Sequence, residues 1–171
     1  LNVDDAFLKN DASDTTTGTI TAAGLTLSET GHVNISTPLL TSADHTYSGI
    51  TAQMLCGDSS NIAAYDLVCI HSTTGEVVRA NASALATARA IGMAMEAISD
   101  TATGTILLQG FVKDETYNWT TIGAPLYLND TVGQITATAP SDDGDFVQVV
   151  GISLTADIAY INPSLDIIEH A

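Results

Sequence analysis

The segment Tyr117-Asn118-Trp119-Thr120 contains the single tryptophan of the chain, two residues after a tyrosine. An exposed aromatic ring can stack on the apolar face of a pyranose, so Tyr117 and Trp119 are candidate contacts to a glycan. A lone Trp in a chain with few aromatic residues more often anchors a core or an interface. The sequence therefore favours an anchoring role for Trp119, and a glycan or interface contact through Tyr117 and Trp119 stays open.

The run Asp142-Asp143-Gly144-Asp145 offers hard oxygen ligands of the kind that calcium prefers. It does not match an EF-hand loop, in which the ligands alternate and a distant Glu completes the site. We interpret the run as an acidic hairpin loop exposed to water. Calcium binding by Asp142, Asp143 and Asp145 is kept as a hypothesis, and no metal ligand is assigned.

No local catalytic motif occurs in the sequence: there is no P-loop, GxSxG, HExxH or strand-linked GxGxxG pattern. The four histidines are widely scattered, at positions 32, 45, 71 and 170. Cys56 and Cys69 lack the spacing of a zinc site, and buried free thiols are favoured over a disulfide between them. We predict a protein that is not an enzyme, with no catalytic residue and no cofactor.

The charge balance excludes some partners. Four basic residues stand against twenty acidic ones, so the formal net charge is -16. Such a surface repels phosphate backbones and anionic lipid head groups, which argues against nucleic-acid and membrane binding. No apolar run approaches the roughly 18 residues of a membrane helix. Because residue 1 is Leu and not Met, we leave open whether the natural beginning is missing.

The elements that would position these residues are predicted to be strands. Thr, Ala, Gly, Ser, Val and Ile dominate, and turn residues interrupt the chain every eight to twelve residues or so. The clearest pattern is a hairpin, with strands at 64–71 and 76–79 around Gly75. Further strands are predicted at 91–95, 104–112, 125–129, 134–139, 146–154 and 158–162. The fold class is therefore all-β, a small antiparallel β-sandwich or barrel.

Three parts are predicted along the chain. Residues 1–45 are rich in Thr, Ser and Asp and contain few large apolar groups. They cannot bury enough surface to fold alone, so we expect an extended, β-rich attachment or shaft-like segment. Residues 46–60 are interpreted as a linker, and residues 61–171 as a compact β-domain.

Two stretches resemble phage structural proteins. The run Ala6-Phe7-Leu8-Lys9-Asn10 through Thr19-Ile20 resembles the FLKN…D-TT-GT segment of phage fibre proteins. From about Ala64 to Asp166 the order of short pieces is similar to C-terminal modules of phage fibre proteins and, in pattern, to capsid decoration (cement) proteins. These pieces include Tyr65-Asp66-Leu67-Val68, Ala90-Ile91-Gly92-Met93-Ala94, Gly104-Thr105-Ile106-Leu107-Leu108 and Val149-Val150-Gly151-Ile152.

The resemblance implies a non-enzymatic phage virion structural protein on the particle surface, in a head or tail fibre or as a capsid decoration. It implies a homotrimer without a cofactor that docks to other virion proteins such as capsid, neck or tail proteins. The alternative is a receptor- or glycan-binding fibre tip domain that contacts a host surface glycan. An enzyme such as a glycan depolymerase is a distant third.

Overall fold

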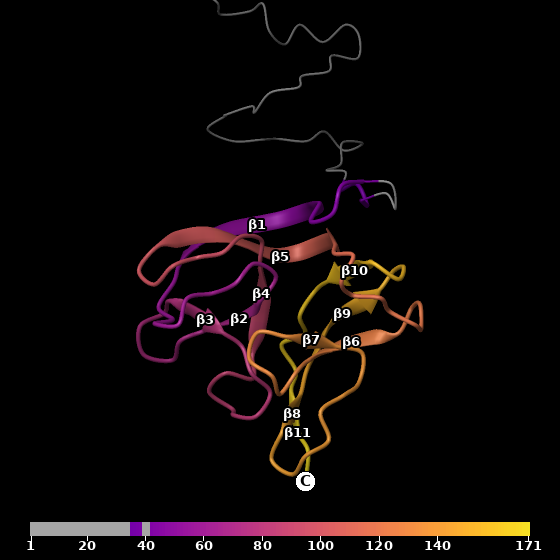
Figure 1. Cartoon of the computed structure of the whole chain (residues 1–171). Coiled ribbons are helices and arrows are strands. Elements are labelled where there is room, and N and C mark those ends of the chain that lie inside the picture. The colour runs from indigo at the N-terminus through magenta and orange to yellow at the C-terminus, as the bar shows by residue number, and fades with distance from the viewer. Residues whose placement is uncertain (1–34, 39–41) are drawn as a thin grey trace, which may run out of the picture. The chain divides into compact units, whose positions relative to one another are not determined.

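The computed structural model describes residues 35–38 and 42–171, which form an all-β structure without a helix (Figure 1). Accordingly, this part of the chain contains no helix long and apolar enough to cross a membrane. The predicted segment 1–45 lies mostly outside the described residues. The strands are β1 (Tyr47–Leu55), β2 (Leu67–Ile70), β3 (Val77–Arg79), β4 (Ala90–Ala94), β5 (Thr103–Lys113), β6 (Pro125–Leu128), β7 (Ile135–Thr136), β8 (Phe146–Val147), β9 (Val149–Ser153), β10 (Ile158–Ile161) and β11 (Ile168–Glu169).

One nine-stranded sheet forms most of the structure and curls into a half-barrel. Its strand order is β3-β2-β4-β5-β10-β9-β6-β7, and β1 pairs with β5 outside this path. Every strand pair in the sheet is antiparallel. Strands β8 and β11 form a separate two-stranded ribbon near the C-terminus (Figure 1). The predicted antiparallel all-β fold is confirmed.

Strand β5 is the longest strand and is shared by three neighbours. Along one edge it pairs with β1, from Tyr47 opposite Val112 to Leu55 opposite Thr103. Along the other edge β4 pairs near Leu107, and β10 pairs beyond Gly110. The register with β1 shifts at the Leu108 position, which indicates a bulge, so side chains before and after it alternate out of phase.

Two hydrophobic clusters lie on the two faces of the sheet. The first includes Leu67, Leu107, Leu126, Val150 and Ile161 and fills the inside of the half-barrel. The second surrounds Val68 and Ile106 on the opposite face of β2 and β5. Adjacent residues such as Leu67 and Val68 are therefore both fully buried, because neighbouring side chains of a strand point to opposite faces.

The predicted hairpin at 64–71 and 76–79 is confirmed as β2 and β3, with Val68 opposite Arg79 and a positive φ of 77° at Gly75. The linker assigned to residues 46–60 is wrong, because Tyr47–Leu55 forms β1 in the sheet. Every residue of β1 is exposed or half-buried, so the strand shows no clear pattern of buried side chains. Backbone pairing with β5 holds it in the sheet instead. The compact unit begins at Ile35 and not at residue 61.

Candidate functional site

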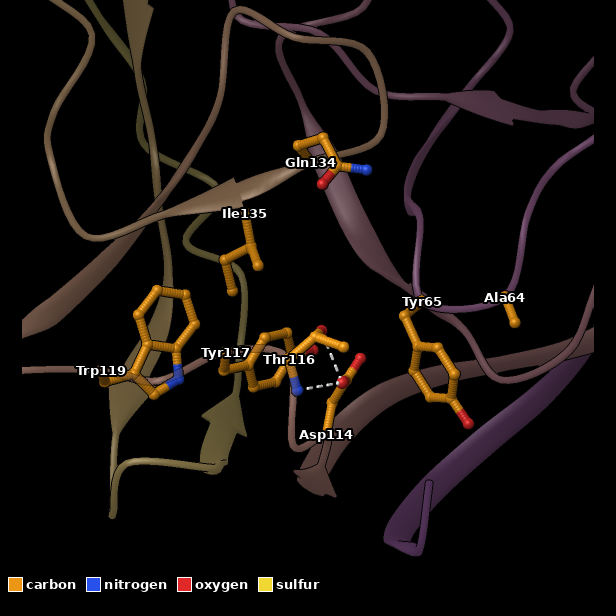
Figure 2. Close-up of a pocket in the computed structure, with 8 residues that line it drawn as sticks. All are labelled: Ala64, Tyr65, Asp114, Thr116, Tyr117, Trp119, Gln134 and Ile135. Atoms are coloured by element: carbon orange, nitrogen blue, oxygen red, sulfur yellow. Dashed lines mark hydrogen bonds between the residues drawn. The ribbon is translucent and has the colours of Figure 1, made fainter. Parts of the chain in front are cut away.

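A pocket of about 330 Å³ opens beside the end of β5 (Figure 2). Three segments that are distant in the sequence supply its walls. One precedes β2, one follows β5, and one begins β7. The lining residues are Ala64, Tyr65, Asp114, Thr116, Tyr117, Trp119, Gln134 and Ile135.

The aromatic residues of this pocket lie in turns at the ends of strands, and the backbone conformation of these turns sets their positions. Tyr65 has a positive φ of 70°, and its N–H donates to the carbonyl oxygen of Ala94 at 2.7 Å. Asn118, between the two predicted contact residues, has a φ of 50°, a conformation that Asn tolerates better than most residues. The N–H of Trp119 donates to the carbonyl oxygen of Ala156 at 2.8 Å, which fixes the end of the turn.

Tyr117 and Trp119 come together as a pair. Their ring centroids are 4.9 Å apart at an interplanar angle of 31°. Figure 2 shows this pair at one end of the pocket and Tyr65 at the other, with Asp114 between them. Both rings of the pair also pack against the first hydrophobic cluster. The arrangement provides aromatic surface together with carboxylate, hydroxyl and amide groups, which are the groups that bind a sugar.

Asp114 is the acidic group of the pocket and is only 5% exposed. Its Oδ1 accepts hydrogen bonds from the backbone N–H and the hydroxyl of Thr116, at 2.8 and 2.6 Å. The Nε2 atom of His45 lies 4.0 Å from the same oxygen and 3.4 Å from Oδ2 of Asp44. A hydrogen bond from the backbone N–H of Glu115, with a further contribution from His45, lowers the pKa of Asp44.

Burial raises the pKa of the Tyr117 hydroxyl, and the charge of Asp114 raises it further. The pKa of Tyr65 is raised for the same two reasons, with Asp44 adding to the effect. Both phenols therefore stay neutral at physiological pH. The hydroxyl of Tyr117 donates to the sulfur of Met93 at 3.6 Å. These tyrosines can provide apolar surface and hydrogen bonds, but not a proton-transfer group near neutral pH.

The ring of Trp119 is half-buried against the core, as an anchoring residue would be. Its Nε1 is buried and has no hydrogen-bond partner among the described residues. Sequence reasoning missed Tyr65, Asp114 and Gln134, which join this pair only in the folded chain. Tyr65 and Asp114 flank the ends of strands, the one signal that could have identified them.

A second surface lies on the outer side of the half-barrel. Opposite residues of an antiparallel pair point to the same face, and Phe111, Tyr160 and Ile152 are opposite one another across β5, β10 and β9. Leu154 directly follows the end of β9, and Ile50 on β1 lies opposite Gln109 on β5. We name Ile50, Phe111, Ile152, Leu154 and Tyr160 the outer apolar face.

Three residues of the outer apolar face are exposed, whereas Phe111 and Tyr160 are half-buried. Ile50 is 52% exposed, Ile152 45% and Leu154 40%. The rings of Phe111 and Tyr160 are in contact, with centroids 5.1 Å apart. Gln109 donates from Nε2 to the Tyr160 hydroxyl at 2.6 Å, which restrains the position of the ring. The other half of the same sheet side is covered by the second hydrophobic cluster.

The remaining candidates lie elsewhere. Asp142 and Asp143 are exposed, as predicted for the acidic loop, whereas Asp145 is only 7% exposed. His71 faces Thr74 in the turn after β2, away from the pocket. Cys56 and Cys69 are both buried and free, which confirms the predicted thiols. His32, one of the four scattered histidines, lies outside the described residues.

Neither a family model nor a curated protein matches the chain.

Proposed function

We propose that this chain is a non-enzymatic structural protein exposed on the surface of a phage particle, in a head or tail fibre or as a capsid decoration. It acts by self-association, as a homotrimer, and by docking to other virion proteins. The assignment to a phage follows from the resemblance in the sequence. The mode of action is supported by one structural observation, the outer apolar face.

The occupant of this face is a second copy of the chain. Monomeric proteins rarely expose a contiguous patch of large apolar side chains across several strands, and such patches commonly mark contact surfaces. Ile50, Ile152 and Leu154 would each lose much of their exposed surface on association. Acidic chains with a net charge of -16 repel one another, so the contact between them must be dominated by apolar burial.

The test is the mass of the full chain in solution, measured by size-exclusion chromatography with light scattering at micromolar concentration. The wild type is expected to be a trimer. Ile152→Asp is expected to give a monomer, because the added carboxylate would have to be desolvated in the contact.

The matched control is Leu85→Asp, which adds the same charge at a 49% exposed leucine outside this face. It should leave the trimer intact. A monomeric wild type, or equal loss of the trimer in both variants, would overturn the proposed self-association.

A second candidate function is glycan binding by the pocket, as in a receptor-binding fibre tip. The observation that favours it is the grouping of Tyr65, Tyr117 and Trp119 around the buried carboxylate of Asp114. Aromatic faces bind the apolar side of a sugar ring, and a few fixed polar groups orient its hydroxyls.

A glycan array probed with the full chain tests this function. Gln134→Ala removes an exposed polar group of the pocket and should weaken any binding severalfold. Gln53→Ala, an exposed glutamine on β1, should leave it unchanged. Absence of binding by the wild type, or equal binding by both variants, would exclude this pocket as a glycan site.

A further inference from the structure

Three carboxylates, from the turn after β6 and the loop before β8, lie close together. The loop leads into the β8–β11 ribbon, which is labelled in Figure 1. Asp130 comes from the turn, and Asp142 and Asp145 come from the loop. One carboxylate oxygen of each lies within 4.8 Å of the others. Asp130 and Asp142 are exposed, so water screens part of the repulsion between these like charges, and a cation held between them would remove the rest.

Asp145 makes this cluster different from a group of surface acids. It is only 7% exposed, and the hydrogen bonds that the described residues make with it involve its backbone N–H and carbonyl oxygen. Its carboxylate points toward the other two carboxylates and forms part of the cavity wall. Among the described residues, Trp119 Nε1 is the one side-chain nitrogen or oxygen atom that is fully buried without a partner, so the carboxylate oxygens of Asp145 open onto the cavity. Carboxylates that converge on such a space are usually paired with a positive charge or coordinate a metal ion.

No ion pair joins a Lys, Arg or His of the described residues to Asp130, Asp142 or Asp145, and His170 contacts the loop through its backbone. Arg79 pairs with Asp58, Lys113 pairs with Glu115, and His45 contacts Asp44 and Asp114. Arg89 lines a different pocket, together with Leu85. The three carboxylates therefore face a cavity with their charges unpaired.

The surroundings hold these carboxylates in place. The N–H of His170 donates to the carbonyl oxygen of Asp145 at 2.7 Å, and Phe146 N–H donates to Ala82 at 2.8 Å. On the other side, Asn81 donates from Nδ2 to the carbonyl oxygen of Asp130 at 2.8 Å. The neighbouring backbone is thus fixed from both sides, so the carboxylates are brought together by the fold and not by flexible surface chains.

The cavity beside the cluster has room for an ion with its waters. Its volume is about 220 Å³. Apart from the three carboxylates, its oxygen-bearing walls include Ser141, Thr138 and Asn129. The set contains oxygen donors without sulfur or imidazole, which suits a hard cation and not zinc or copper.

We propose that Asp130, Asp142 and Asp145 bind a Ca²⁺ ion, with waters and nearby hydroxyl oxygens completing its shell. Calcium accepts six to eight oxygens in an irregular arrangement, whereas Mg²⁺ demands a near-ideal octahedron and releases its waters reluctantly. The ion joins the turn after β6 to the loop before β8. It thereby fixes the C-terminal ribbon, whose last described hydrogen bonds run through Asp145 and His170.

Isothermal titration of the chelator-treated full chain with CaCl₂ measures this binding directly. One ion per chain is expected, with a dissociation constant of about 10⁻⁴–10⁻³ M, as for sites with few charged ligands. At 10 mM CaCl₂ the melting temperature should rise by roughly 3–8 °C, and MgCl₂ should give a smaller rise.

Variants locate the site. Asp142→Asn removes an exposed ligand without disturbing the core and should weaken binding at least about tenfold. Asp145→Asn should abolish it. Asp143→Asn is the matched control, because it removes the same charge from the same loop outside the cluster. Asp44→Asn, in the cluster with His45 and Asp114, should also have no effect.

Absence of a calcium heat and of a melting shift in the wild type would overturn the proposal. So would an Asp143→Asn variant that loses as much affinity as Asp142→Asn, because the effect would then be one of general loop charge. Limited proteolysis gives a second readout: Ca²⁺ should slow cleavage near His170 in the wild type but not in Asp142→Asn. None of these outcomes depends on self-association or glycan binding.

Discussion

Gln148 is a single polar side chain that connects three parts of the fold from a fully buried position. It is 1% exposed, and its Oε1 accepts from the N–H of Ala90 at 2.8 Å. Its Nε2 donates to the carbonyl oxygens of Ala90 and Ser164, at 2.9 and 2.6 Å. The amide thus joins β4 to the segment between β8 and β9 and to the chain after β10.

Replacing Gln148 with Leu should therefore be costly. The change keeps the side-chain volume similar but leaves buried backbone groups of Ala90 and Ser164 without this partner, at a cost of about 2–4 kcal/mol in the free energy of unfolding. Urea unfolding measures the loss. The exposed control Gln53→Leu should change stability by less than about 0.5 kcal/mol. Similar losses in the two variants would contradict the role of Gln148.

Cys69 gives the native state a pH dependence on the alkaline side. Burial raises the pKa of its thiol from an ordinary 9.0 to about 11. Between these values the unfolded chain has lost a proton that the native chain keeps, so stability from the neutral thiol is complete below about pH 9. It is then lost as the pH rises to about 11.

Urea unfolding of wild type and Cys69→Ala at pH 8 and pH 10.5, with reductant present, checks this dependence. Wild-type stability should fall by about 2 kcal/mol more than that of the variant over this interval, from the two-unit pKa difference. The comparison concerns the slope with pH, because the smaller side chain also lowers stability at every pH. Rapid alkylation of Cys69 in the native protein at pH 8 would contradict its burial.

At the scale of the elements, β1 and β5 approach each other closely at a pair of opposed glycines. Gly49 and Gly110 lie opposite each other, and a Cβ on Gly110 would clash with the backbone of Ser48 and Gly49. The obstacle is backbone, so it cannot rotate away. Only glycine at these two positions lets β1 lie this close to β5.

Gly110→Ala is accordingly expected to lower stability by about 1–3 kcal/mol or more, by forcing the two strands apart. Thermal and urea unfolding measure this loss. The control Thr103→Ala lies at the exposed start of the same strand and should be nearly neutral. A Gly110→Ala variant as stable as this control would show that β1 tolerates displacement.

The strands that bury side chains could be predicted from the sequence, since alternation and turn residues marked β2, β3, β5 and β10. Strand β1 escaped because it buries little and depends on backbone pairing with β5. The predicted strand at 146–154 is divided at Gln148 into β8 and β9. The sequence does not reveal this interruption, because it depends on the hydrogen bonds that the buried Gln148 side chain makes with Ala90 and Ser164.

Each candidate site combines residues that are close in the sequence, which could be predicted, with residues that only the fold brings to them. Tyr117 and Trp119 are two residues apart in the sequence, so they could be named together as candidate contacts from the sequence alone. Tyr65 reaches the same pocket only through the curling of the sheet. Likewise Asp145 was visible in its acidic run, but Asp130 joins it because the turn after β6 folds against that loop. Contacts across the half-barrel leave no local pattern.

For the molecule as a whole, net charge opposes the proposed assembly of copies. Each chain carries a formal charge of -16, so a trimer concentrates strongly like-charged surfaces. Salt screens such repulsion over about 10 Å at 0.1 M ionic strength. Association through the outer apolar face should therefore strengthen when NaCl is raised from about 20 to 300 mM.

Light scattering at several protein concentrations measures this salt dependence. The trimer dissociation constant should fall as salt rises, and Ile152→Asp should remain monomeric at both salt concentrations. Weaker association at high salt would indicate a contact held by opposite charges, which is contrary to the apolar contact proposed here.

The position of β5 between β1, β4 and β10 also determines the order in which the protein can form during synthesis. Strand β1 leaves the ribosome before β5, so it stays unpaired until Lys113 has emerged, and the part of the other edge of β5 that lies beyond its pairing with β4 waits for β10 to end at Ile161. Such non-local pairing slows folding. The nascent chain therefore carries unpaired strand edges for much of its translation, and rapid synthesis at high concentration should favour aggregation over the native half-barrel.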